Sequence, residues 1–175
     1  MNRLFLVLIV LCLLGWGCRK DGRERIFEMA YPSFTIEIPA GIAPTQALDF
    51  PFYDINTNID FFLNQSNTDT SAIYAINPYF ARLTSLDNLT YYFIEQVSVR
   101  ICPNTGEACS YADEVFYIDD LRGRGDGRLD LLPTLRNVKP LLTGKKYRMD
   151  VVFFLSDYTP YNISGRFDMS FEAVR

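Results

Sequence analysis

The feature that most constrains this fold is an alternation of apolar and polar residues with a period of two, which is clearest over residues 163–174. One face of that segment carries Ile163, Gly165, Phe167, Met169, Phe171 and Ala173, and the other carries Ser164, Arg166, Asp168, Ser170 and Glu172. Successive side chains of a β-strand point to opposite sides, so this pattern predicts a strand with one buried face.

The same alternation recurs along the chain and predicts an all-β protein. It is strong over residues 33–38, 97–101 and 146–155, and weaker over residues 48–55, 59–63, 73–76 and 115–118. Helical periodicity is confined to residues 78–86 and 134–142, each long enough for a turn or two. Glu95 interrupts an apolar face, which predicts a β-bulge or a strand end at that position.

We expect these strands to form one domain over residues 33–175, a two-sheet antiparallel β-sandwich of immunoglobulin-like size. A small closed β-barrel is the alternative. The chain has 175 residues, of which 49% are hydrophobic and 15% aromatic, enough for one packed core.

The last two predicted strands, residues 146–155 and 163–174, are joined by a short polar link, which predicts an antiparallel hairpin. Matching the apolar faces and opposing unlike charges selects a register with Arg148 opposite Asp168. The same register places Asp150 beside Arg166.

The first residues are organised like a secretory signal. Arg3 precedes the unbroken apolar run from Leu4 to Leu14, which is too short to span a bilayer. Small residues then lead to Cys18, an arrangement that resembles a bacterial lipobox, in which the cysteine is lipidated. We predict a signal peptide over residues 1–17 and a lipid anchor with a charged tether over residues 18–32. A secreted protein without lipid and an uncleaved anchor are the alternatives.

The residues after the cysteine bear on the destination. Arg19 follows Cys18, where an aspartate holds some lipoproteins at the inner membrane. The start of the mature chain, with Lys20 and Asp21, resembles that of short outer-membrane lipoproteins of Bacteroidota. This resemblance implies attachment to the outer membrane through N-terminal acyl chains, and we favour the cell surface over the periplasmic face.

Two cysteines remain for the body of the protein. Cys12 belongs to the predicted signal peptide and Cys18 to the lipid anchor, whereas Cys102 and Cys109 flank a stretch of turn-forming residues. Exported proteins fold in an oxidising compartment, so we predict a disulfide between this pair. Free buried thiols are the alternative.

Several function classes are disfavoured by composition. The chain contains no histidine, which excludes Ser-His and Cys-His nucleophiles and histidine-containing zinc sites. Its net charge of −4 argues against a nucleic-acid partner, which needs a basic surface. We find no Gly-x-Ser-x-Gly elbow or phosphate-binding loop, and therefore predict a protein that is not an enzyme and uses no cofactor.

One acidic segment was considered as a metal site. Residues 119–130 contain Asp119, Asp120, Asp126 and Asp130, and carboxylate oxygens of this kind bind calcium. An EF-hand alignment on its glycines places arginines at ligand positions, so we interpret the segment as a solvated loop. Calcium binding is the alternative.

Tyrosine is the most informative residue type for function. Of eleven tyrosines, Tyr111, Tyr158 and Tyr161 fall in predicted loops. Tyrosine offers a rigid contact area with a polar tip and favours binding surfaces, although it also fills β-sandwich cores. We predict a non-catalytic module that binds a protein of an envelope assembly. A carbohydrate-binding surface lipoprotein that uses the loop tyrosines Tyr158 and Tyr161 is the alternative.

Overall fold

The structure is a computed structural model, and it describes residues 23–121 and 126–175. This part of the chain is an all-β protein, as the alternation predicted. The strands are β1 (Arg25–Ala30), β2 (Phe34–Ile38), β3 (Leu48–Asn56), β4 (Ala75–Ser85), β5 (Ile94–Pro103), β6 (Glu114–Ile118), β7 (Arg128–Pro133), β8 (Lys146–Leu155) and β9 (Ile163–Val174). The helices are short: α2 (Ile59–Gln65), α3 (Lys139–Leu142) and the 3-10 turn η1 (Tyr111–Asp113).

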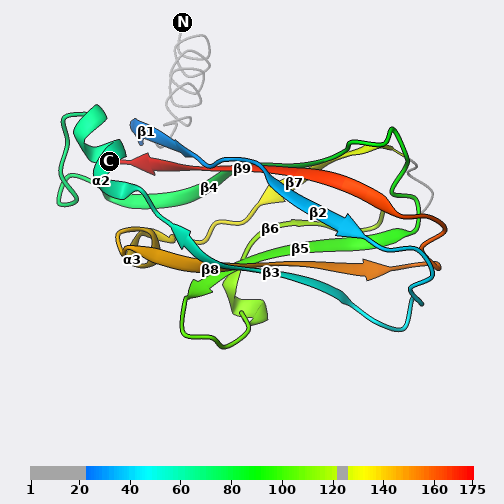
Figure 1. Cartoon of the computed structure of the whole chain (residues 1–175). Helices are drawn as coiled ribbons and strands as arrows, with labels where there is room; N and C mark the ends of the chain where they lie inside the picture. Colours follow the sequence, from blue (N-terminus) through cyan, green and yellow to red (C-terminus); the bar gives the residue numbers. More distant parts are fainter. Residues whose placement is uncertain (1–22, 122–125) are drawn as a thin grey trace, which may run out of the picture.

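All of the strand pairs are antiparallel and belong to one sheet, with the order β1-β9-β4-β7-β6-β5-β8-β3. β2 pairs with β9 beside β1, so these two short strands follow each other along one edge. The sheet curls into a half-barrel, with β1, β9, β4 and β7 in one half and β5, β8 and β3 in the other (Figure 1). A short ladder, Phe116 opposite Pro133 and Tyr117 opposite Leu132, joins the halves through β6 and β7.

The hydrophobic core fills the space between the two halves. The face of β9 that the alternation selected is buried throughout, from Ile163 to Ala173. The apolar face of β8 is buried as well, including Tyr147, Met149 and Phe153. The strand faces were therefore predicted correctly, because alternation records directly which side of a strand meets the core.

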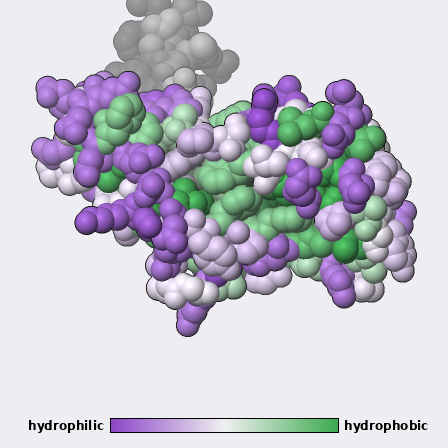
Figure 2. All heavy atoms as spheres, in the orientation of Figure 1, coloured by the Kyte–Doolittle hydropathy of each residue, from purple (hydrophilic) through white to green (hydrophobic). Residues whose placement is uncertain are grey.

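The two-sheet sandwich is not confirmed, because the β6–β7 ladder connects the halves into one sheet. The curled sheet is not closed either: in the described part of the chain no backbone ladder joins β2 to β3. Side chains fill the seam between these edges, where the rings of Phe34 and Phe52 meet edge-on at 5.1 Å. Figure 2 shows hydrophobic residues gathered on this face, in the zone where Figure 1 places β2 opposite β3.

The predicted C-terminal hairpin is wrong. β8 pairs with β3 and β5, whereas β9 pairs with β1, β2 and β4, so the two strands lie in opposite halves of the sheet. Arg148 consequently faces Cys102 of β5, and Asp168 faces Arg82 of β4. The link over residues 156–162 crosses from one half of the sheet to the other. Because of this crossing, β8 and β9 do not pair with each other, and the charges on their outer faces do not set a register between them.

Two local predictions also fail for identifiable reasons. Residues 59–63 form helix α2, whose buried residues Ile59 and Phe62 have the spacing of one helical face. The alternation of Ile59, Phe61 and Leu63, which predicted a strand, does not correspond to a buried strand face. Residues 78–86, predicted as a helical turn, belong mostly to β4, where the register shifts between Pro78 and Phe80. A bulge accommodates the proline within the strand.

The remaining predictions for elements agree with the structure more closely. α3 lies within the predicted helical segment, and the register of β5 shifts between Ile94 and Gln96, which confirms a bulge at Glu95. The sheet begins at Arg25, inside the range predicted as tether, because β1 pairs with the end of β9. β7 begins at Arg128, within the predicted acidic loop.

Candidate functional site

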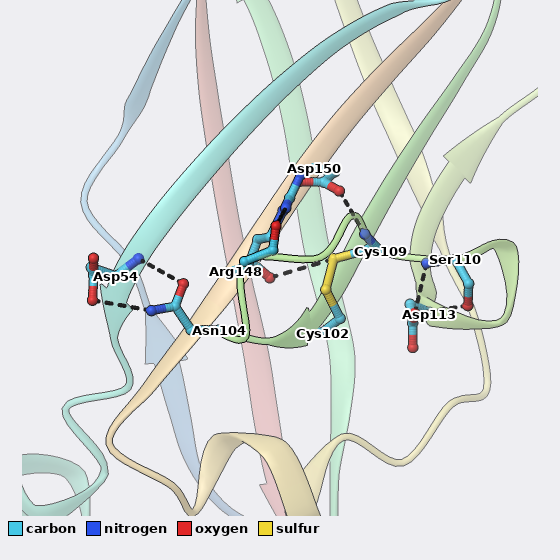
Figure 3. Close-up of polar contacts among 9 residues, drawn as sticks. Asp54, Cys102, Asn104, Cys109, Ser110, Asp113, Arg148 and Asp150 are labelled. Atoms are coloured by element: carbon cyan, nitrogen blue, oxygen red, sulfur yellow. Dashed lines mark hydrogen bonds and ion pairs between the residues drawn. A yellow bond between two sulfur atoms is a disulfide. The ribbon is translucent and has the colours of Figure 1, made fainter.

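The predicted disulfide joins β5 to the loop that follows it. Cys102 lies near the end of β5 and is bonded to Cys109, with a Cα–Cα distance of 5.5 Å. This separation confirms the pairing, which requires Cα atoms within about 7 Å. The loop lies across the outer side of the sheet, over β8, as Figure 3 shows.

A buried ion pair on β8 holds this loop in place. Arg148 donates from Nε to Oδ1 of Asp150 at 2.6 Å, and the backbone N–H of Cys109 donates to the other carboxylate oxygen at 2.8 Å (Figure 3). Arg148 also donates to the carbonyl of Gly106 at 3.1 Å. Both charged side chains point outward from the core, as the alternation predicts, yet both are buried because the loop covers them.

A second buried arginine lies beside this pair. Arg100 is opposite Asp150 in the β5–β8 ladder and opposite Glu114 in the β5–β6 ladder. Its Nε donates to the hydroxyl of Ser98 at 3.1 Å, and that hydroxyl donates to Glu114 at 2.6 Å. The Nη2 atom of Arg100 is buried with no hydrogen-bond partner among the described residues.

An exposed tyrosine covers each arginine. The guanidinium of Arg100 lies 4.0 Å from the ring centre of Tyr111, and that of Arg148 lies 4.7 Å from the ring centre of Tyr53. Tyr111 is 71% exposed and Tyr53 is 52% exposed. Cation–π attraction fixes one face of each ring and leaves the other open to solvent. We call this set the arginine–tyrosine platform: Tyr53, Arg100, Tyr111, Arg148 and Asp150.

Polar contacts brace both margins of the platform. Asn104 donates to the carboxylate of Asp54 at 3.1 Å and accepts from the backbone N–H of Asp54, so the loop is held to β3 (Figure 3). On the other side, the carboxylate of Asp113 accepts from the backbone N–H and the hydroxyl of Ser110, forming a capping box that starts the turn carrying Tyr111. The disulfide and these hydrogen bonds hold the loop in one conformation. A partner that binds here would therefore cost the loop less conformational entropy.

Burial and neighbouring charges shift the pKa values of two groups at the platform. Asp49 lies on β3 beside the platform, and desolvation raises the pKa of its carboxyl, with a smaller contribution from the charge of Asp150. The hydrogen bond to Asp150 raises the pKa of the Arg148 guanidinium. Two buried guanidinium groups thus lie beneath two exposed aromatic rings, an arrangement suited to contact with the surface of another protein.

The three tyrosines predicted as a binding surface do not come together. Tyr111 belongs to the platform, and Tyr158 is exposed in the link between β8 and β9. Tyr161 has a structural role, because its hydroxyl donates to the carbonyl of Thr90 at 2.6 Å and its ring meets Phe93 edge-on. Of the pair proposed for carbohydrate binding, only Tyr158 offers an exposed ring.

The acidic segment considered for calcium is interrupted by residues 122–125, which lie outside the described residues. Asp119 and Asp120 follow β6, and Asp126 precedes β7. Asp130 lies on β7, where hydrogen bonds from Arg128 and Arg82 lower the pKa of its carboxyl. In the described ranges, no three His, Cys, Asp or Glu residues form a group that could hold a metal ion.

The predicted signal peptide, residues 1–17, and the predicted lipidation site, Cys18, lie outside the described residues. Among residues 23–121 and 126–175, no helix has the length and apolar character needed to cross a membrane.

Most of the platform was missed by sequence reasoning. The sequence pattern predicts strand positions for Tyr53, Arg100, Arg148 and Asp150 and indicates no binding role for them. The available signal was the repetition of charged residues on the outer faces of β5 and β8, next to two cysteines predicted to staple a loop. Comparison with known proteins adds no further assignment: no family model matches this chain, and no curated protein matches its sequence.

Proposed function

We propose that this chain is a lipid-anchored protein of the outer membrane whose body is a non-catalytic module that binds another envelope protein. Cys18 carries the acyl chains, and the half-barrel presents the arginine–tyrosine platform to the partner. The cell surface is the favoured side. The anchor rests on the signal-like N-terminus and its lipobox-like cysteine.

The observation that carries the binding function is the pair of exposed tyrosines stacked on buried arginines beside a disulfide-stapled loop. Tyrosine and arginine dominate the energetic centres of protein interfaces. A rigid loop lowers the entropy that association costs. The disulfide also agrees with folding in an oxidising compartment, which an exported protein requires.

Photocrosslinking in intact cells tests the platform. A photoreactive phenylalanine analogue at position 111 should give one discrete adduct, whereas the same analogue at position 158 should not. Tyr158 is a matched control because it is also an exposed tyrosine on a link between strands. Tyr53→Ala should weaken the adduct at position 111, since loss of an anchor tyrosine costs about 2 kcal/mol, or about 30-fold in affinity.

Two results would refute the proposal. Equal crosslinking from positions 111 and 158 would show that the platform has no preferred partner. A Cys18→Ser variant that stays membrane-bound at its mature mass would show that the acyl anchor is absent. Glycan binding that Tyr158→Ala abolishes would instead support the carbohydrate-binding alternative.

A further inference from the structure

A second aromatic surface lies on the outer side of the other half of the sheet, where the described chain begins. The guanidinium of Arg25 lies 4.0 Å from the ring centre of Tyr79, and that of Arg23 lies 4.9 Å from the ring centre of Tyr74. Beside them is an open groove of about 720 Å³ that Arg23, Tyr79, Pro133 and Leu135 help to line. We call this set the entry surface: Arg23, Arg25, Tyr74, Tyr79, Pro133 and Leu135.

The entry surface exposes three large side chains with apolar bodies to solvent. Leu135 is fully exposed, Tyr74 is 64% exposed and Tyr79 is 43% exposed. Tyr79 stands at the point where the register of β4 shifts, so a bulge turns its ring away from the core. Arg25 is positioned by a hydrogen bond to Glu172 on β9. The strand bulge and the hydrogen bond therefore hold the Tyr79 ring and the Arg25 side chain in place on the outside of the sheet.

We propose that the entry surface rests on the headgroup region of the membrane and orients the body. This inference depends on the anchoring of Cys18 that we proposed above. Arg23 is five positions after Cys18, so at about 3.6 Å per residue the Cα of Arg23, at the margin of the entry surface, lies within about 18 Å of the lipidated cysteine. The polar headgroup region is itself roughly 5–8 Å deep.

The side chains match that environment. Tyrosine rings concentrate at membrane interfaces, where the apolar body meets acyl chains and the hydroxyl meets water. Arg25 is held by Glu172 and Glu28, so Arg23 is the arginine whose guanidinium would reach phosphate groups while its stem lies along apolar surface. The chain as a whole is acidic, so rings and Leu135, rather than net charge, supply the attraction. The lipid anchor holds the body near the membrane at an effective concentration on the order of millimolar. At that concentration, a weak interaction between the entry surface and the headgroups is sufficient to orient the body.

This orientation accounts for the position of the platform. The entry surface is carried by β1, β4, β7 and the residues next to them, in one half of the sheet, whereas the disulfide loop lies over β8, in the other half (Figure 1). With the entry surface against the bilayer, Tyr53 and Tyr111 face away from it and remain accessible to a partner.

Tryptophan quenching by brominated lipid tests the orientation. The only tryptophan of the chain is Trp16, which lies in the predicted signal peptide, and a Trp16→Phe background removes it from any unprocessed protein as well. In that background, Leu135→Trp and Tyr79→Trp place a probe on the entry surface, and Tyr158→Trp places one on the link between β8 and β9. The protein is expressed with its signal peptide so that Cys18 can be processed and lipidated. It is then reconstituted in vesicles of phosphatidylethanolamine and phosphatidylglycerol with dibrominated acyl chains, and flotation confirms attachment.

We expect both entry-surface probes to be quenched at least about two-fold more strongly than the probe at position 158, because acyl-chain bromine quenches only tryptophans that lie close to it, and a tryptophan at the membrane interface lies next to the acyl chains. Equal quenching in floating vesicles would overturn the orientation and leave the anchor intact. A blue-shifted but unquenched probe would overturn it too, by showing that protein, such as a second copy, covers the surface. Failure to float would refute the anchor, and this inference with it.

Discussion

Neutralising Asp150 is the most direct test of how the platform is held. The carboxylate accepts hydrogen bonds from Arg148 and from the backbone of Cys109, and it faces Arg100 in the ladder. Asp150→Asn keeps the shape of the side chain but removes the charge. The asparagine side chain has one carbonyl oxygen to accept hydrogen bonds from both Arg148 and the backbone of Cys109. The buried guanidinium groups of Arg148 and Arg100 then lack a negative charge beside them.

The expected cost follows from the burial of the pair. Breaking a buried ion pair by removing one partner costs about 3–5 kcal/mol, because the other charge stays buried without compensation. For a domain of this size, that corresponds to a fall of about 6–20 °C in the melting temperature. Adding Arg148→Met removes the stranded charge, so the double variant should be less destabilised than the sum of the singles by about 1–3 kcal/mol.

Urea unfolding followed by far-UV circular dichroism measures these differences. The control is Glu24→Gln, which removes the charge from the exposed pair that Glu24 forms with Arg175 at 2.7 Å. Exposed ion pairs contribute about 0–1 kcal/mol, so this change should be nearly neutral. A cost for Asp150→Asn as small as that of the control, or strictly additive single variants, would refute the proposed role of the buried pair.

Three further outcomes are expected. Replacing both Cys102 and Cys109 with serine opens a loop with a sequence separation of 7 and should cost about 2–3 kcal/mol, and the melting temperature of the variant, unlike that of the wild type, should not respond to reductant. Gly165→Ala would place a Cβ 2.8 Å from Leu83 Cδ1 and from the hydroxyl of Tyr91, so overpacking should cost about 1–3 kcal/mol. Tyr91→Phe, which removes a buried hydroxyl without a partner among the described residues, should recover part of that loss in thermal melts; simple addition of the two effects would contradict the contact. Asp49 has a raised pKa when folded, so the folded state loses stability as the pH rises above 3.8 through that raised value; relative to wild type, Asp49→Asn should therefore be more stable at pH 7 than at pH 3, and an unchanged difference would contradict this.

Strand positions and their buried faces could be predicted wherever one side of a strand meets the core. β9 and β8 show this, since each buries the face that alternation selected. The disulfide was predictable too, because two cysteines across a turn can lie close together in almost any fold. Helix α2 could not be predicted, because a short apolar run fits a strand and a helix about equally well. Tertiary packing selects the helix, which buries the face with Ile59 and Phe62.

The candidate site shows the same division more sharply. The sequence placed Arg148 and Asp150 on the outer face of a strand, which is correct, and Tyr111 in a loop, where the structure has the 3-10 turn η1 in the connection between β5 and β6. It indicated nothing of the burial of the two charges, because the loop that covers them comes from another part of the chain.

The sequence by itself thus determined the all-β class, the inward face of each main strand and the cysteine pair, since these depend on neighbours a few residues apart. Only the tertiary structure decided that β8 and β9 part into opposite halves of the sheet and that the disulfide loop folds over β8. It also decided that Tyr53 and Tyr111 cover neighbouring arginines. Such contacts depend on which edges of the sheet meet, a choice made by the burial of the whole apolar surface rather than by any local run of residues.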